Sequence, residues 1–255
     1  MSENNILIFG HGKWSKKIIK FLMTEKKFNE IYVKTSSRLF KIFPKKKELD
    51  HKEFKSLINN IKYLHICTPT NSHFDIVRKN NLHNKKIIIE KPLVYKKNDL
   101  ENIESYFKSN KIIVNYIDLY NPSISKINEE ISSLTSFNLD FGNNISFFKK
   151  KECLNEWLDH PLAIVLTLFK KFSKFKILYY KNVKIKNKYI EKLHICYSFK
   201  KTTINLKINL HFPKHQRIIK IKNKSSFKNF NFRFKPKEIV SKNGSYKNNS
   251  FNYLY

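Results

Sequence analysis

The stretch ILIFGHGKWS, residues 6–15, decides how the first half of the chain folds. Its leading residues, Ile6–Phe9, are apolar and β-prone, which predicts a buried strand. Apolar residues then recur at helical spacing from Trp14 to Leu22 and predict an amphipathic helix. The chain holds only 4 glycines, and Gly10 and Gly12 both stand between this strand and this helix. Because glycine is so scarce elsewhere, the pair predicts a tight turn with a close approach of the backbone.

The glycine turn matches a pattern that is typical of dinucleotide-binding folds. Gly10-x-Gly12-x-x-Ser15 fits G-x-G-x-x-G with serine in the third place, where a small residue allows the helix to pack on the strand. The free amides and the positive dipole end of the helix favour a pyrophosphate. We therefore expect Gly10, Gly12 and Lys13 to contact a dinucleotide coenzyme. The alternative is a purely structural turn in another doubly wound fold.

Strands and helices alternate as far as Tyr116, which is typical of βαβ units around a parallel sheet. Asn71 or Ser72 is expected to cap the third helix, and Asn98 with Glu101 is expected to form a capping box on the fourth. The expected strands are Ile6–Phe9, Ile31–Lys34, Tyr63–Cys67, Ile87–Ile89 and Ile112–Asn115, and the expected helices are Trp14–Leu22, Phe54–Ile61, His73–Leu82 and Leu100–Phe107.

The pattern changes after the segment YNP at residues 120–122. A helix, a strand-like stretch to Phe148, a second helix and the alternating strands of an open, mostly antiparallel sheet are expected in this order. The helices are expected at Ser123–Ser133 and Leu162–Phe172, and the tail from Ser241 to Tyr255 is expected to be disordered. The sequence therefore predicts an α/β protein, with a Rossmann-type doubly wound parallel sheet over residues 1–119 and an α+β domain over residues 120–255.

Length and composition restrict the classes of protein. The chain has 255 residues, and its longest apolar run, Leu162–Phe169, is far too short to span a bilayer. The first residues lack the basic start of a secretory signal, so we expect a cytoplasmic protein without membrane contact. Cys67, Cys153 and Cys196 are odd in number and form no C-x-x-C motif, so neither a disulfide framework nor a metal site is indicated.

The net charge of +31 favours anionic ligands but does not by itself indicate a nucleic-acid partner. Lysine supplies nearly all of the positive charge, since the arginines are only Arg38, Arg78, Arg217 and Arg233. Base and phosphate recognition prefers the planar guanidinium, and no nucleic-acid motif is present. We interpret most of the lysines as solvated surface. The alternative, a basic nucleic-acid binder, predicts strongly salt-dependent association with DNA or RNA.

The end of the second predicted strand reads KTSSR, residues 34–38. In dinucleotide-binding domains an acidic residue at this place binds the ribose 2′-hydroxyl of NAD, whereas an arginine accommodates the 2′-phosphate of NADP. The segment has hydroxyls and an arginine but no carboxylate. We therefore expect Ser36 and Arg38 to favour NADP over NAD. The alternative is that Arg38 is only a surface cation.

Four motifs occur in a fixed order: the glycine turn with its following Trp14, CTPTNSH at residues 67–73, EKP at 90–92 and YNP at 120–122. Together they resemble the glucose-fructose oxidoreductase and inositol dehydrogenase (Gfo/Idh/MocA) family over most of the chain. The resemblance implies a nucleotide-binding domain, an α/β domain with an open sheet, and a homo-oligomer formed through that sheet. A structural role at a helix start is the alternative for His73. The implied coenzyme contacts are Trp14, Thr68, Pro69, His73 and Glu90.

The resemblance also implies which residues carry the chemistry. Lys91 follows a predicted strand, at the edge where ligands bind in open α/β folds, and by the resemblance it donates to a substrate hydroxyl or carbonyl. The segment LNEWLDH, residues 154–160, resembles the family's D-x-x-x-H, which implies that His160 exchanges the proton and that Glu156 orients His160, Lys91 or both. A helix that begins at Pro161 would remove the four-residue spacing and make Asp159 the competing carboxylate.

These features predict an NAD(P)-dependent oxidoreductase that acts on the CH–OH group of a sugar, cyclitol or nucleotide-linked sugar. The substrate class comes from the resemblance alone. The chain is short for that family, and the missing length falls in the second domain. The alternative is therefore a dinucleotide-binding protein without turnover, a sensor or partner subunit with a reduced substrate domain.

Overall fold

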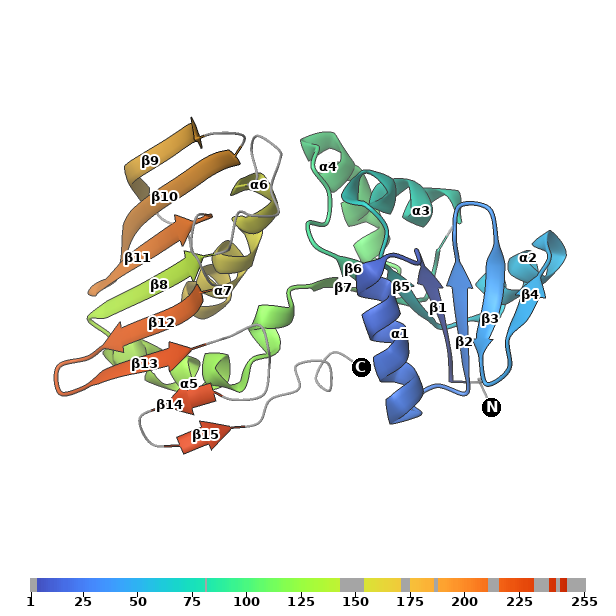
Figure 1. Ribbon diagram of the computed structural model, residues 1–255, viewed down its shortest axis with the longest axis horizontal. Coiled ribbons are helices and arrows are strands. Elements are labelled where there is room, and N and C mark those ends of the chain that lie inside the picture. Colours follow the sequence, from blue (N-terminus) through green and yellow to red (C-terminus); the bar gives the residue numbers. More distant parts are fainter. Residues whose placement is uncertain are drawn as a thin grey trace. The chain divides into compact units, whose positions relative to one another are not determined.

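The computed structural model describes residues 4–80, 82–142, 154–170, 175–185, 188–210, 216–231, 239–241 and 244–246 (Figure 1). The chain divides into two compact units, the first ending at Asn115 and the second beginning at Tyr116. The boundary expected near residue 119 lies in the short 3-10 helix η2, Ile117–Tyr120. Each unit has its own sheet and its own hydrophobic core.

The first unit is built on a seven-stranded sheet with the order β4-β3-β2-β1-β5-β6-β7. The five strands from β2 to β7 in that order pair in parallel, and β3 and β4 add an antiparallel edge. The strands are β1 (Asn5–Phe9), β2 (Glu30–Lys34), β3 (Leu39–Phe43), β4 (Lys47–Leu49), β5 (Tyr63–Ile66), β6 (Lys86–Glu90) and β7 (Lys111–Asn115). The helices are α1 (Lys13–Glu25), α2 (His51–Asn60), η1 (Thr70–Ser72), α3 (His73–Lys79) and α4 (Lys97–Phe107).

Strand β1 lies at the centre of this sheet, and all of its residues are buried. Leu7 and Phe9 belong to a core cluster with residues of α2, α3 and α4. Ile18 and Leu22 of α1 are fully buried as well, and Figure 1 shows α1 lying across the strands. Helices therefore cover both faces of the sheet, and the expected doubly wound α/β architecture is confirmed, with every expected strand and helix of this half present.

The expected helix caps in the first unit are wrong. Neither Asn71 nor Ser72 caps α3, because the Ser72 hydroxyl donates instead to the Pro69 carbonyl oxygen at 2.7 Å. Helix α4 begins after Lys96, so Asn98 and Glu101 lie inside the helix.

The capping box is found on α2, at a place the sequence analysis did not single out. The Glu53 N–H donates to the Asp50 side chain at 2.8 Å, and the Asp50 N–H donates back to the Glu53 carboxylate at 2.7 Å. The antiparallel pair β3 and β4 was likewise not predicted, because lysines interrupt its apolar alternation.

The second unit is built on a six-stranded sheet with the order β13-β12-β8-β11-β10-β9. Only β8 and β11 pair in parallel within it, which confirms an open, mostly antiparallel sheet. The elements are α5 (Pro122–Glu130), η3 (Ile131–Ser133), β8 (Ser136–Gly142), α6 (Leu154–Trp157), α7 (Asp159–Phe169), β9 (Phe175–Ile185), β10 (Lys188–Phe199), β11 (Thr202–Asn209), β12 (Gln216–Lys222) and β13 (Phe227–Asn231), with the separate pair β14 (Ile239–Ser241) and β15 (Gly244–Tyr246).

Helices α5 and α7 pack on one face of this sheet. Ile127 of α5 and Val165 of α7 are fully buried in one cluster with Phe137 and Leu139 of β8. The opposite face carries polar contacts, such as that from the Asn205 amide to Asn138 at 3.0 Å, and also the exposed rings of Tyr179 and Phe227. Association through this face stays a prediction.

Several boundaries in the second unit differ from those expected. Helix α7 starts at Asp159 and ends at Phe169, whereas Leu162–Phe172 was expected. The strand expected to reach Phe148 is described only as far as Gly142. The expectation of a disordered tail is wrong for Gly244–Tyr246, which forms β15, and the remainder of the tail lies outside the described residues. Among the described helices, none has the length and hydropathy that a bilayer span needs.

Candidate functional site

The glycine turn joins β1 to α1 in a conformation that depends on both glycines. Gly10 has φ +99°, and its N–H donates to the Lys34 carbonyl oxygen at 2.8 Å. A Cβ atom on Gly10 would lie only 2.7 Å from the carbonyl oxygen of Cys67. Any larger residue at Gly10 would therefore collide with the neighbouring strand end.

Gly12 serves the turn differently, because its surroundings are open. No atom lies within 4 Å of a Cβ built on Gly12, and Gly12 is the N-cap residue of α1 without any side-chain cap. The amino end of α1 therefore has no side-chain cap, and the space beside Gly12 is open within the described residues. Ser15 is fully buried, and its hydroxyl donates to the Gly12 carbonyl oxygen at 3.0 Å, as expected for a small third residue. The turn thus offers the backbone seat that a diphosphate requires.

The end of β2 forms a tight turn next to this seat in the sheet. The Arg38 N–H donates to the Thr35 hydroxyl at 2.9 Å, and the Thr35 N–H donates to the Arg38 carbonyl oxygen at 2.8 Å. The turn leaves Ser36 and Arg38 exposed at the carboxyl end of a strand that pairs with β1. Both side chains can therefore reach a ligand at this edge.

Three donors meet on one carboxylate at the same edge of the sheet. Glu90 Oε1 lies 2.7 Å from Trp14 Nε1, 2.7 Å from Asn115 Nδ2 and 3.0 Å from His65 Nε2. The His65 side chain is fully buried, on the face that α1 covers. The network therefore ties the first turn of α1 to the strand end that precedes Lys91.

The donors keep the Glu90 carboxyl charged. Burial alone would raise its pKa, but the hydrogen bonds from His65, Asn115 and Trp14, with the charge of His65, outweigh burial and hold the pKa below its ordinary value. Burial, and secondarily the Glu90 charge, raises the pKa of the Cys67 thiol far above its usual range. Although His65, Cys67 and Glu90 place ligating atoms within 4.8 Å of one another, a neutral thiol and a carboxylate oxygen with three donors favour a hydrogen-bonded network over a metal site.

Replacing Glu90 with glutamine is expected to make the free energy of unfolding less dependent on pH in the acid range. Because the folded pKa of Glu90 is lowered, its charged contacts stabilise the fold above its unfolded pKa of about 4.3, and this contribution disappears as the pH falls through the folded pKa. Glu90→Gln should cost about 1–3 kcal/mol at neutral pH, and this difference should shrink below about pH 4. Urea unfolding across pH measures it.

The matched control for this substitution is Glu101→Gln. Glu101 pairs with Lys97 at 3.5 Å on the exposed side of α4, and its side chain is 61% exposed. Its substitution should change stability little at any pH. A stability difference for Glu90→Gln that stays constant down to acid pH would contradict the role given to the charged carboxylate.

His73 connects the loops that follow β5 and β6. Its ring is fully buried, with Nε2 2.8 Å from the Thr68 carbonyl oxygen and Nδ1 3.1 Å from the Leu93 carbonyl oxygen. The Ser72 hydroxyl adds a contact to the Thr68 hydroxyl at 2.8 Å. These contacts match the structural role that was the alternative for His73, while Pro69 on the same loop is exposed.

Lys91 comes directly after β6, at the carboxyl end of the sheet. Its position follows from the strand, since Glu90 ends β6 and the Lys91-Pro92 peptide turns the chain away from the sheet. The glycine turn, the Glu90 network and Lys91 all lie at strand ends of one sheet edge, where open α/β folds bind their ligands.

The second unit holds a separate cluster around His160, which is the second residue of α7 and is buried. Its Nδ1 atom lies 2.9 Å from Oδ2 of Asp118, a residue of η2. The negative charge of a carboxylate oxygen this close to Nδ1 favours a proton on that nitrogen and leaves Nε2 as the ring nitrogen able to accept one.

Of the two carboxylates expected beside His160, those of Asp159 and Glu156, the structure describes only that of Asp159. The Asp159 carboxylate accepts the backbone N–H of His160 at 2.9 Å. The helix begins at Asp159 rather than at Pro161, so Pro161 lies in the first turn, where a missing N–H costs no helical hydrogen bond. The side chain of Glu156 lies outside the described part of the chain.

Arg217 of β12 completes the cluster. Its side chain is only 3% exposed, and Nε lies 3.8 Å from Oδ1 of Asp118. The guanidinium carbon lies 3.8 Å from the centre of the Phe141 ring and 5.5 Å from that of Trp157. Both rings also stack beside His160, each with its centre 6.0 Å away. An imidazole, a carboxylate and a guanidinium are thus held together between aromatic rings.

Sequence reasoning missed four residues of these clusters: His65, Asn115, Asp118 and Arg217. A signal existed for Arg217, because it alternates with the buried Ile219 and Ile221 and therefore falls on the core face of β12. His65 likewise stands inside an apolar strand, where a polar residue requires a partner. No local pattern marks Asp118.

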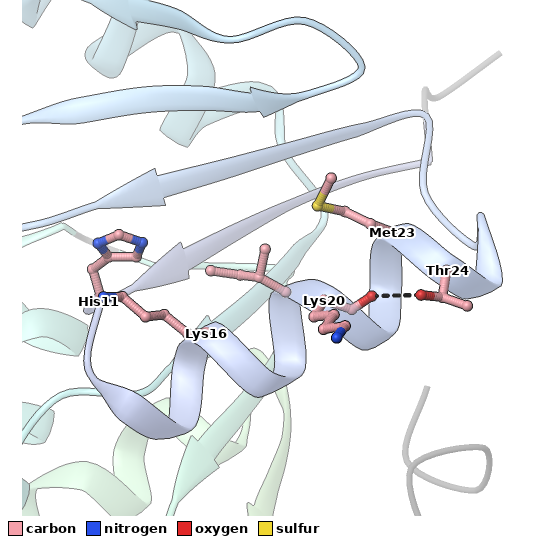
Figure 2. A pocket seen from close by; sticks show the side chains of 6 residues that line it. His11, Lys16, Lys20, Met23 and Thr24 are labelled. Carbon is pink, nitrogen blue, oxygen red and sulfur yellow. Dashed lines mark hydrogen bonds between the residues drawn. The ribbon is translucent and has the colours of Figure 1, made fainter.

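Two hollows lie away from these clusters. One, of about 340 Å³, runs along the outer side of α1 from the glycine turn, and Figure 2 shows the Thr24 hydroxyl donating to the Lys20 carbonyl oxygen beside it. It is lined by His11, Lys16, Ile19, Lys20, Met23 and Thr24. The other, of about 580 Å³, lies between α2 and residues of β1, β2 and β4 and includes Asn5, Tyr32, Leu49 and Leu57. The second is at the edge opposite the glycine turn.

Comparison with known proteins agrees with this geometry. Residues 4–116 match the model of the Gfo/Idh/MocA family, an oxidoreductase family with an NAD-binding Rossmann fold. No curated protein matches the chain.

Solved structures match almost the whole chain at low identity, which shows a shared fold. A dehydrogenase (MviM) from Clostridium difficile has 16% identity and a TM-score of 0.69, over 96% of this chain and 82% of its own. UDP-N-acetylglucosamine 3-dehydrogenase GnnA from Acidithiobacillus ferrooxidans has 12% identity and a TM-score of 0.67, over 96% and 84%. A myo-inositol dehydrogenase from Corynebacterium glutamicum has 12% identity and a TM-score of 0.69, over 89% and 74%.

Proposed function

We propose, because residues 4–116 match the model of the Gfo/Idh/MocA oxidoreductase family, that the chain is a dehydrogenase that transfers a hydride between a nicotinamide coenzyme and a secondary alcohol or ketone of a sugar-like substrate. The observation that carries the proposal is the open backbone seat at Gly12, beside a Gly10 that tolerates no side chain. The sugar-like substrate class is supported by the family resemblance and by neighbours named as sugar and cyclitol dehydrogenases.

The residues of the first unit fit a dinucleotide. The amides after Gly12 would hold the diphosphate, with Lys13 adding positive charge. Trp14 and Glu90 would shape the edge of the site through their mutual hydrogen bond, next to the loop of Thr68 and Pro69. When bound, the coenzyme supplies the hydride acceptor or donor.

Lys91 and His160 have complementary tasks in this proposal. The Lys91 ammonium donates to the substrate oxygen and stabilises the negative charge that develops on it. His160 accepts the hydroxyl proton on Nε2, while Asp118 faces Nδ1. Asp118 therefore takes the orienting part that the sequence pattern gives to Glu156.

We propose NADP as the favoured coenzyme, because Ser36 and Arg38 are exposed at the end of β2 and no carboxylate accompanies them. Arg38→Ala is expected to weaken NADPH binding roughly tenfold to a hundredfold, since a hydrogen bond between charged groups is worth about 1.5–3 kcal/mol. NADH binding should change little. Calorimetric titration of both coenzymes measures the two affinities.

The control for Arg38 is Arg78→Ala, which removes the same charge on α3, where Arg78 pairs with Asp75 at 3.1 Å. It should leave both affinities unchanged apart from a small general electrostatic effect. An equal loss for NADPH and NADH in Arg38→Ala would count against a 2′-phosphate contact.

The function itself is tested by coenzyme binding and by turnover. Calorimetry with NADPH, NADP⁺, NADH and NAD⁺ should register binding of at least one coenzyme. Steady-state assays with a panel of sugars, cyclitols and nucleotide sugars should then detect oxidation or reduction at 340 nm, the absorbance of reduced nicotinamide. Binding without turnover on the full panel would favour the alternative, a non-catalytic dinucleotide-binding protein. The absence of any binding would refute both.

A further inference from the structure

Arg217 is a charged residue on a face of β12 that is otherwise apolar. Its neighbours on the same face, Ile219 and Ile221, are buried in the core of the second unit. An arginine at such a position loses its hydration, and burial accordingly lowers the pKa of its guanidinium, against the opposing effect of Asp118 and Asp159. Because burying a charged group is unfavourable, the Arg217 guanidinium requires groups of opposite charge close to it.

The groups around His160 include the negative charges that the positive charge of Arg217 offsets. Asp118 faces Nδ1 at 2.9 Å, and Asp159 accepts the His160 N–H at 2.9 Å. Tyr116 contacts the ring edge-on, and because burial and the Asp159 charge raise its pKa to about 12 it carries no charge near neutral pH. Asp118 of η2 therefore faces the imidazole, Asp159 of α7 binds the backbone N–H of the same residue, and the Arg217 guanidinium lies beside Asp118.

Two partly buried carboxylates close to a histidine favour the imidazolium, which cannot accept a proton. A guanidinium close to those carboxylates cancels part of the negative electrostatic potential that they produce at the His160 ring. The Arg217 guanidinium carbon lies 3.8 Å from the centre of the Phe141 ring, and this ring also stacks beside His160. Packing therefore fixes the distance between the guanidinium and the imidazole.

We propose that Arg217 is a positioning residue for His160: its charge offsets Asp118 and Asp159 and keeps the imidazole neutral, with the proton on Nδ1 and with Nε2 as the acceptor. Arg217 itself is too buried to meet a ligand and acts only through the cluster. The use of Nε2 in proton transfer rests on the proposed function, whereas the charge balance does not.

The test is made on the full chain without substrate. Long-range proton–nitrogen correlation spectra of protein labelled with ¹⁵N-histidine report the tautomer and the ratio of imidazolium to imidazole for each ring, and His160→Gln assigns the signal. At neutral pH, Arg217→Met should raise that ratio for His160 on the order of tenfold. Arg217→Lys, which keeps the charge, should stay within about twofold of the native ratio.

Lys220→Met is the matched control, because Lys220 lies on the opposite face of β12 and pairs with Asp140 at 2.9 Å. It should leave the His160 signal unchanged. If Arg217→Met does not fold, Asp118→Asn provides the second measurement and should lower the ratio several-fold, since one carboxylate is lost.

The outcomes separate the inference from the proposed function. An unchanged ratio in Arg217→Met, or in Asp118→Asn where the methionine variant does not fold, would overturn the inference. So would equal effects of Arg217→Met and Arg217→Lys, which indicate packing rather than charge. Coenzyme binding is measured on the same samples, and its absence would refute the proposed function without altering the result on His160.

Discussion

Gly10→Ala is expected to destabilise the chain by about 3 kcal/mol or more. Two causes add at this residue. The backbone has φ +99°, which alanine adopts only with strain, and the new Cβ atom would lie 2.7 Å from the Cys67 carbonyl oxygen. Because that oxygen belongs to the backbone at the end of β5, it cannot move aside without disturbing the sheet. Urea unfolding followed by circular dichroism measures the loss.

Gly12→Ala is the matched partner of this substitution, two residues further on. Its Cβ atom meets no atom within 4 Å, so stability should change by less than about 1 kcal/mol. Coenzyme affinity should nevertheless fall more than about tenfold, because the methyl group occupies the space through which a diphosphate approaches the amides of α1. Normal coenzyme binding by a stable Gly12→Ala protein would refute the backbone seat. A Gly10→Ala protein of native stability would refute the described turn.

His160→Asn is expected to lower kcat by about a hundredfold to ten-thousandfold, with a much smaller effect on the affinity for coenzyme. Asparagine keeps a polar group beside Asp118 but has no nitrogen that accepts a proton near neutral pH. Since the coenzyme seat lies in the first unit and His160 in the second, calorimetry should find coenzyme binding close to native. Steady-state kinetics with the substrate found in the panel measures kcat.

His194→Asn is the control for this experiment. His194 contacts Asn205 at 3.2 Å on the polar face of the sheet, opposite the core face. Its replacement should leave kcat within about twofold of native. A His160→Asn enzyme with native kcat would show that the proton acceptor is another group.

Lys91→Met, the companion test of the other proposed catalytic residue, should also remove most of the turnover. Lys86→Met, at the amino end of the same strand β6, should not. Equal effects of the two lysine substitutions would indicate that general charge, and not the position of Lys91, matters.

The sequence predicts those parts of the fold that depend on local patterns. The strand, glycine turn and helix of residues 6–22 follow from periodicity and from the scarcity of glycine, and the parallel sheet follows from the βαβ alternation. The antiparallel β3 and β4 could not be predicted, since their lysines leave no clear alternation. The expected Ser72 cap was wrong because η1 runs directly into α3, so that Ser72 has a helical rather than an extended backbone, and its hydroxyl donates to the Pro69 carbonyl oxygen.

The residues of the candidate sites likewise fall into those that a local sequence motif predicts and those that it does not. Residues named by a contiguous motif, such as Gly10, Lys91 and His160, could be found from the sequence. Their partners could not, because Asp118 comes 42 residues before His160 in the chain and Arg217 comes from strand β12, further along it. Such contacts depend on tertiary packing, which a single sequence leaves unspecified.

The two tryptophans of the chain are divided between the two compact units, Trp14 in the first and Trp157 in the second. Trp14 donates its indole N–H to Glu90, and Trp157 stacks beside His160. The tryptophan fluorescence of a Trp157→Phe protein therefore comes from the first unit alone. The tryptophan fluorescence of a Trp14→Phe protein comes from the second unit alone. The chain thus carries an intrinsic optical probe at each of its two clusters, with which events in either half can be followed without an attached dye.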